Sequence, residues 1–99
     1  MEQKTLDLAG KKAEAIAYSF GPVNLVFART DKGMIGCGLF DIAVFDRFNL
    51  PAAKMKAADG GLIRTVDDLL AATAREVNQS GQRAGIQSGM SGREILEKL

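Results

Sequence analysis

The sequence contains no histidine, no tryptophan and only one cysteine. Histidine is the most frequent general base and metal ligand in proteins, so its absence excludes a Ser-His-Asp or Cys-His site within one chain. A zinc site built from His and Cys is also excluded, because one thiolate cannot fill a tetrahedral shell. Catalysis would depend on Asp, Glu, Lys, Tyr or Cys, or on groups from another subunit. We expect no metal and no cofactor.

The sequence also lacks long apolar runs. No run approaches the roughly 20 residues that a membrane-spanning helix needs, and residues 1–4 precede no apolar segment typical of a signal peptide. A single cysteine cannot form an internal disulfide. We therefore expect a cytoplasmic protein with a reduced thiol and no membrane association.

The charges nearly balance. Thirteen basic and twelve acidic residues give a formal charge of +1. This argues against a nucleic-acid partner, because proteins that bind nucleic acids carry a basic excess or a basic stripe. The 99 residues, 46% of them hydrophobic, suffice for one modest core. We expect a single domain over residues 1–99.

Alternating apolar and polar residues predict strands in the first two thirds of the chain. The predicted strands cover residues 4–9, 12–20, 24–30, 34–39 and 53–58. Short turns separate the early strands, which favours an antiparallel meander. We expect Gly33 to adopt a positive φ in the last of these turns. The alternating Lys54 and Lys56 could bind an anion, but we favour an edge position for the final strand, where lysines prevent pairing with another chain.

The periodicity changes at Asp41, a good N-cap residue. Ile42, Phe45 and Phe48 follow at intervals of three, so we predict a short helix over residues 41–48. An extension of the preceding strand over residues 39–45 remains an alternative.

The last third of the chain carries three Ser/Thr-x-x-acid sequences typical of helix N-termini. They run from Thr65 to Asp68, from Thr73 to Glu76 and from Ser91 to Glu94. We predict helical structure from Val66 to Ala84 with a break near Thr73, then a final helix after Ser91. One unbroken helix over residues 66–84 is the alternative. Gly85 fits a position just beyond a helix C-terminus.

Together these elements predict an α+β fold. We expect a two-layer α/β sandwich with a mostly antiparallel sheet of four or five strands and helices on one face.

Three segments carry a resemblance to a known family. Residues 31–41, 64–70 and 85–94 together resemble the YunC-like family of small bacterial and archaeal proteins, a domain of unknown function. The resemblance extends over nearly the whole chain. It implies a compact two-layer α/β fold, and it implies neither a reaction nor catalytic residues.

Cys37 is the first candidate site residue, because Gly36 and Gly38 flank it. One hypothesis is a thiolate nucleophile or redox sensor activated by Lys32, with Asp41 nearby. The other is a small buried hydrophobic residue, and we favour it because free cysteine is among the most buried residue types. Gly36 and Gly38 would allow close approach by either a main chain or a ligand.

The segment from Gly89 to Arg93 is the second candidate. The helix N-terminus at Ser91 and the guanidinium of Arg93 suit a small anionic ligand, so Gly89, Ser91 and Arg93 are candidate binding residues. However, Glu94 is placed to fill that position as part of a capping box, and we favour this interpretation.

Paired carboxylates are a weaker candidate. Asp41 with Asp46, or Asp67 with Asp68, would need a strongly shifted pKa to act as an acid and a base. Capping explains Asp41 and Asp68 without any chemistry.

The sequence therefore favours a small domain that binds a ligand or partner as a homo-oligomer. The expected partners are a second copy of the chain and a small anionic ligand. The alternative is an enzyme or redox sensor that uses the thiol of Cys37.

Overall fold

The chain begins with three antiparallel strands joined by tight turns, as its alternating pattern predicts. The computed structural model describes residues 1–99, and its first strands are β1 (Glu2–Leu8), β2 (Lys11–Phe20) and β3 (Val23–Arg29). Ala9 and Gly10 connect β1 to β2 with φ values of 53° and 79°. Positive φ at both central positions is typical of the type I′ hairpin turn.

A parallel strand pair follows. Strand β4 (Met34–Gly36) lies beside β5 (Ala52–Lys56), and the 3₁₀ helix η1 (Ile42–Phe48) connects them. The Asp41 carboxylate caps η1 by accepting from the N–H of Ala43 at 3.2 Å. The predicted helix over residues 41–48 is confirmed, and its alternative, a longer strand, is wrong.

The last third alternates helices with one further strand. The elements are α1 (Val66–Ala71), β6 (Thr73–Val77), α2 (Gln79–Arg83) and α3 (Gly92–Lys98). The predicted break near Thr73 is confirmed, but the predicted helix beyond it is wrong for residues 73–77. There the chain pairs with β5 on one side. On the other side, Ala74 exchanges hydrogen bonds with Met90 and Gly89.

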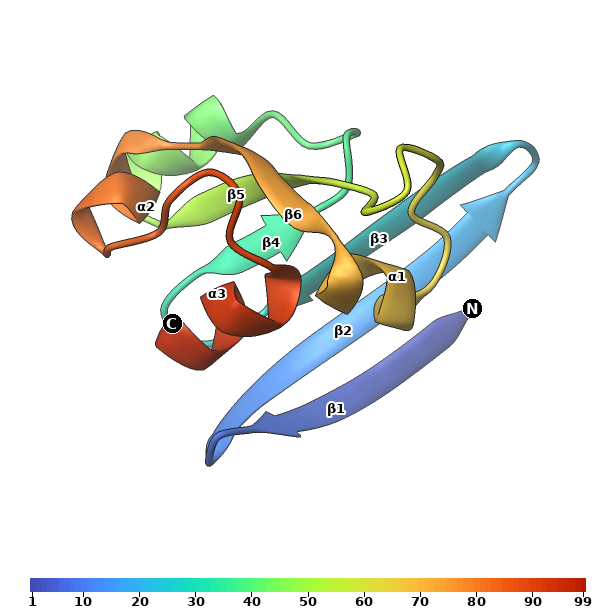
Figure 1. Cartoon of the computed structure of the whole chain (residues 1–99), viewed down its shortest axis with the longest axis horizontal. Helices are drawn as coiled ribbons and strands as arrows, with labels where there is room; N and C mark the ends of the chain where they lie inside the picture. The colour runs from blue at the N-terminus through green and yellow to red at the C-terminus, as the bar shows by residue number, and fades with distance from the viewer.

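The sheet has six strands in the order in which they occur in the sequence, β1 to β6, and Figure 1 shows them side by side. All neighbours are antiparallel except β4 and β5. The predicted α+β fold with a mostly antiparallel sheet is confirmed. The predicted count of four or five strands is wrong because β6 was expected to be helical. Since β5 lies between β4 and β6, Lys54 and Lys56 do not protect a sheet edge.

The core lies between one face of the sheet and helices α1 and α3, which lie together in front of the sheet in Figure 1. On β2 that face consists of Ala13, Ala15 and Ala17, all buried. Alanines leave room for the helices to approach closely, and fully buried leucine and isoleucine side chains of the helices fill the space.

A smaller cluster lies on the opposite face. Ile42 of η1 packs there with Met34 and Ala52, which alternate along their strands with core residues. The prediction that all helices lie on one face is therefore wrong. A short crossover between parallel strands has placed η1 on the face that α1 and α3 leave open.

Two of the three predicted capping boxes are present. Thr65 and Asp68 cap α1, and Ser91 and Glu94 cap α3. Gly85 follows α2 with a φ of 91°, as predicted. The prediction of a positive φ at Gly33 is wrong. Gly33 is needed there for space, since a Cβ would lie 2.7 Å from the carbonyl oxygen of Pro51.

The side chain of Asn78 joins four parts of the chain. Its amide nitrogen donates to the carbonyls of Ile42 at 3.2 Å and Leu50 at 2.9 Å. Its amide oxygen accepts from the N–H groups of Ala52 at 3.0 Å and Gly81 at 2.7 Å. Asn78 is 6% exposed, so these bonds are shielded from water and fix the crossover between the parallel strands.

We expect the Asn78→Ala substitution to destabilise the protein by about 3 kcal/mol or more, because it leaves buried donors and acceptors unpaired and removes the α2 cap. Urea unfolding measures the change. The neighbouring Gln79→Ala substitution alters an exposed side chain and should change stability by less than about 0.5 kcal/mol. Equal effects of the two substitutions would contradict the role assigned to Asn78.

No helix of the structure is long and apolar enough to cross a membrane.

Candidate functional site

A cavity of about 670 Å³ opens where the parallel strands β4 and β5 end. Cys37, Gly38 and Leu39 line it just after β4, and the last residues of β5 line it from the neighbouring strand. Ligands in open sheets bind preferentially at the carboxyl ends of parallel strands. We call this space the Cys37 cavity.

Two cationic side chains line the Cys37 cavity. Lys56 comes from the end of β5 and Arg75 from β6, and both are exposed. Neither forms an ion pair, whereas the nearby Lys54 binds Glu76 at 3.2 Å. Two unpaired cations in one cavity favour an anionic group in the ligand.

The remaining wall is largely apolar. Met55 and Ile63 are buried and form its inner part, while Leu39 and Leu62 are 55% and 62% exposed. Large aliphatic side chains this exposed are available to cover an apolar ligand. A Cβ on Gly38 or Gly60 would meet no atom within 4 Å, so open space faces both glycines.

Cys37 lies at the boundary between the cavity and the core. It is 5% exposed and packs within the main hydrophobic cluster. Its thiol donates a weak hydrogen bond to the carbonyl of Asn24 at 3.6 Å, and its N–H donates to Val26 at 3.0 Å. The structure thus shows a buried thiol that also lines a cavity.

Lys32 and Asp41, which were expected near Cys37, lie elsewhere. Lys32 precedes β4 and lines a different cavity, beside Arg29 and Leu99. Asp41 is an exposed cap of η1. Because Lys32 and Cys37 are at opposite ends of β4, these three side chains do not line one pocket.

Gly36 and Gly38 differ in their surroundings. The space beside Gly36 is filled by the ring of Phe40, which a Cβ at this position would overlap. Gly36 is therefore a close-packing residue on the face opposite the core, while Gly38 lines the Cys37 cavity.

Gly89, Ser91 and Arg93 lie together at the start of α3, away from the Cys37 cavity. The Glu94 carboxylate accepts from the N–H of Ser91 at 2.9 Å, and this hydrogen bond lowers the pKa of Glu94. The carboxylate thus occupies the position that an anion would take. Arg93 is exposed and forms no ion pair.

The paired carboxylates are likewise separated by their capping roles. Asp46 accepts from the N–H of Ser80 at 2.9 Å and from its hydroxyl at 2.8 Å, and the N–H of Gln79 donates at 3.2 Å. The backbone N–H of Ser80 is the main cause that holds the pKa of Asp46 below its ordinary value. Asp46 thus accepts from the first N–H groups of α2, which Asn78 caps, whereas Asp41 caps η1. No group of three His, Cys, Asp or Glu side chains is placed to hold a metal ion.

The sequence-based analysis missed Arg75 and Leu62 as cavity residues. The Gly60-Gly61 pair in the loop that follows β5 was the available signal, since glycines allow close approach of a ligand. Arg75 gave no signal because residues 73–77 were expected to be helical.

The fold and the cavity define a class: an α+β domain with a cation-lined cavity at the end of its parallel strand pair. The domain of unknown function DUF1805 matches residues 36–99, a span that includes Cys37, Lys56 and Arg75. The chain belongs to this family.

One sequence relative and one solved structure are similar to this chain. The chain is 32% identical over 92 residues to the uncharacterized protein YunC of Bacillus subtilis, covering 93% of this chain and 90% of the relative. The crystal structure of TA1206, a protein of unknown function from Thermoplasma acidophilum, matches with a TM-score of 0.86 at 24% identity. That match covers 99% of this chain and 91% of the other, and shows a shared fold. The resemblance to the YunC-like family is confirmed.

We expect the Gly36→Ala substitution to destabilise the protein by about 1–3 kcal/mol, because the added methyl overlaps the Phe40 ring. The matched Gly38→Ala substitution places its methyl in open space and should cost less than about 0.5 kcal/mol. Thermal unfolding of both variants checks the difference. A Gly38→Ala protein less stable than the Gly36→Ala protein would refute the assigned surroundings.

Proposed function

We propose that this protein binds a small ligand that combines an anionic group with an apolar portion, and that the ligand occupies the Cys37 cavity. The observation that carries this proposal is the pair of unpaired cations, Lys56 and Arg75, in one cavity with an apolar wall. The cavity volume of about 670 Å³ lies within the range of small-molecule sites, about 300–1,000 Å³.

The charged, apolar and glycine residues that line the Cys37 cavity have separate roles in this proposal. Arg75 and Lys56 bind the carboxylate or phosphate, and the guanidinium fork favours two parallel hydrogen bonds. The apolar portion lies against Met55 and Ile63 and is covered by Leu39 and Leu62. Gly38, Gly60 and Gly61 keep the opening free of side chains, so the ligand can approach the main chain closely.

Self-association is part of the same proposal. The outer face of β2 and β3 carries Ile16, Tyr18, Phe20 and Leu25, which lie outside both hydrophobic clusters. Tyr18 and Phe20 are 44% and 50% exposed. A second copy would bury this face and enlarge a modest core. Sedimentation of a monomer at every concentration would rule out self-association.

A second candidate function is thiol chemistry at Cys37 in the same cavity. The place of Cys37 in the lining of an open cavity that also carries Lys56 and Arg75 favours it. Burial within the core works against it. The reactivity of the thiol toward an alkylating reagent separates these opposing effects.

A single free thiol also supports a cytoplasmic location, which we include in the proposal.

We expect hexyl phosphate, a probe with one anionic group and a short apolar chain, to bind saturably in isothermal titration calorimetry. Arg75→Ala should weaken its binding about tenfold, because a charge-assisted hydrogen bond is lost. Arg93→Ala is the matched control, since it removes another exposed, unpaired arginine outside the cavity.

Two results would contradict the proposal. One is the absence of binding to the unmodified protein. The other is an equal loss of affinity in the Arg75→Ala and Arg93→Ala proteins, which would indicate a general charge effect or a site at α3.

A further inference from the structure

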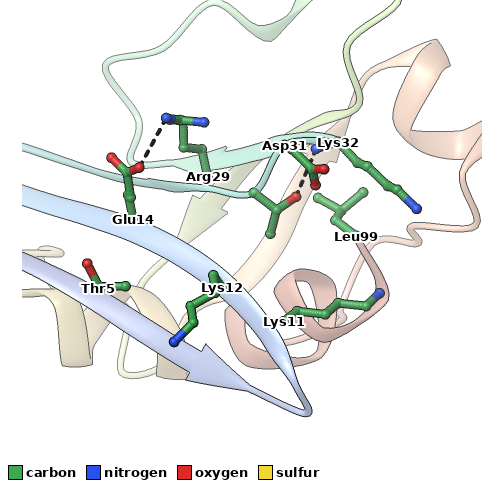
Figure 2. A pocket seen from close by; sticks show the side chains of 9 residues that line it. Thr5, Lys11, Lys12, Glu14, Arg29, Asp31, Lys32 and Leu99 are labelled. Atoms are coloured by element: carbon green, nitrogen blue, oxygen red, sulfur yellow. Dashed lines mark hydrogen bonds and ion pairs between the residues drawn. The ribbon is translucent and has the colours of Figure 1, made fainter.

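A second concave surface lies where β2 extends beyond its neighbour. Strand β2 begins at Lys11, but its pairing with β3 begins only at Glu14 opposite Arg29. Residues 11–13 therefore pair with β1 alone. The loop that leads from β3 to β4 lies beside these residues and leaves a notch of about 620 Å³, which Figure 2 shows.

Four cationic side chains line this basic notch: Lys11, Lys12, Arg29 and Lys32. Two of them have acidic partners. Lys12 lies 3.8 Å from Asp7, and Arg29 lies 3.2 Å from Glu14. Lys11 and Lys32 form no ion pair. In Figure 2 they lie on either side of Leu99. The notch thus retains an excess of positive charge, even with the Asp31 carboxylate at its rim.

The loop that carries Lys32 is held in place by its own hydrogen bonds. The Thr30 hydroxyl accepts from the N–H of Lys32 at 3.1 Å, and the N–H of Thr30 donates to the carbonyl of Gly33 at 2.9 Å. Thr30 is buried, so this turn is anchored to the body of the protein. An anchored turn reduces the entropy lost when Lys32 engages a ligand.

Leu99 is the only apolar residue among the nine that line the notch. Recognition there would depend on charge and hydrogen bonding, since the other eight lining residues are polar or charged. This separates the notch from the Cys37 cavity, which has a large apolar wall.

We propose that the basic notch binds a compact anion that carries two or more negative charges. Phosphate esters and small polycarboxylates share this chemistry. Lys11 and Lys32 supply the unpaired positive charge. Arg29 offers its remaining N–H groups, since the contact with Glu14 engages one guanidinium nitrogen. This site is independent of the ligand proposed for the Cys37 cavity.

A purely structural role for the lysines is the competing explanation. Lys11 and Lys32 lie beside Leu99, where the negative end of the α3 dipole favours cations. In that case their removal would lower stability and leave anion binding unchanged.

Calorimetric titration of the full chain with inorganic diphosphate at low ionic strength tests the proposal, with citrate as the polycarboxylate arm. We expect saturable binding of diphosphate with a dissociation constant of about 1 mM or lower. Lys32→Ala should weaken it about tenfold. Arg93→Ala, which removes an exposed, unpaired cation outside both cavities, should change it less than about twofold. Binding of both diphosphate and citrate would indicate a general polyanion site. Binding of diphosphate alone would indicate a site for phosphate groups.

Three outcomes would overturn the proposal. The first is no binding of either anion. The second is an equal weakening by Lys32→Ala and Arg93→Ala. The third is a Lys32→Ala protein with a lower melting temperature and unchanged affinity for diphosphate, which would assign Lys32 to the α3 terminus.

Discussion

The parallel pairing of β4 and β5 is the constraint on which the rest of this structure depends. Parallel neighbours need a crossover, and here the crossover is only fifteen residues long, from Cys37 to Pro51. Asn78 fixes it, because one buried amide bonds η1, the end of the crossover, β5 and α2. The same pairing brings the ends of two strands together and creates the Cys37 cavity. Fold and candidate site therefore share one cause.

Local patterns were sufficient to predict most of the elements. Alternation and turn residues predicted β1 to β3, and the Asp41, Thr65 and Ser91 caps marked η1, α1 and α3. The prediction of a helix was wrong for Thr73–Val77, which forms β6. It rested on the capping-box spacing of Thr73 and Glu76 and on the helical spacing of Ala74 and Val77. Its strand conformation depends on β5 and on the segment around Met90, which are distant in sequence. Tertiary pairing has overridden the local pattern.

The candidate site was less predictable than the fold. Cys37 and Gly38, which their glycine-rich context had made candidates, line the cavity, but Lys32 and Asp41 lie elsewhere. Arg75, Lys56 and Leu62 come from different segments, and only the strand order β4-β5-β6 brings them to one cavity. No spacing within the sequence encodes that proximity. The sequence also did not predict which lysine of β5 forms an ion pair. Lys54 pairs with Glu76, whereas Lys56 has no acidic partner.

The most direct test of the central claim is the alkylation rate of Cys37 by iodoacetamide, in the folded and the unfolded protein, with and without hexyl phosphate, from about pH 5 to about pH 9. The account predicts that the folded protein reacts at least about tenfold more slowly than the unfolded chain, because the thiol is 5% exposed. It also predicts that hexyl phosphate slows the reaction further by filling the cavity. A folded protein that reacts faster than the unfolded chain at low pH, at a rate independent of hexyl phosphate, would contradict ligand binding there and favour thiol chemistry.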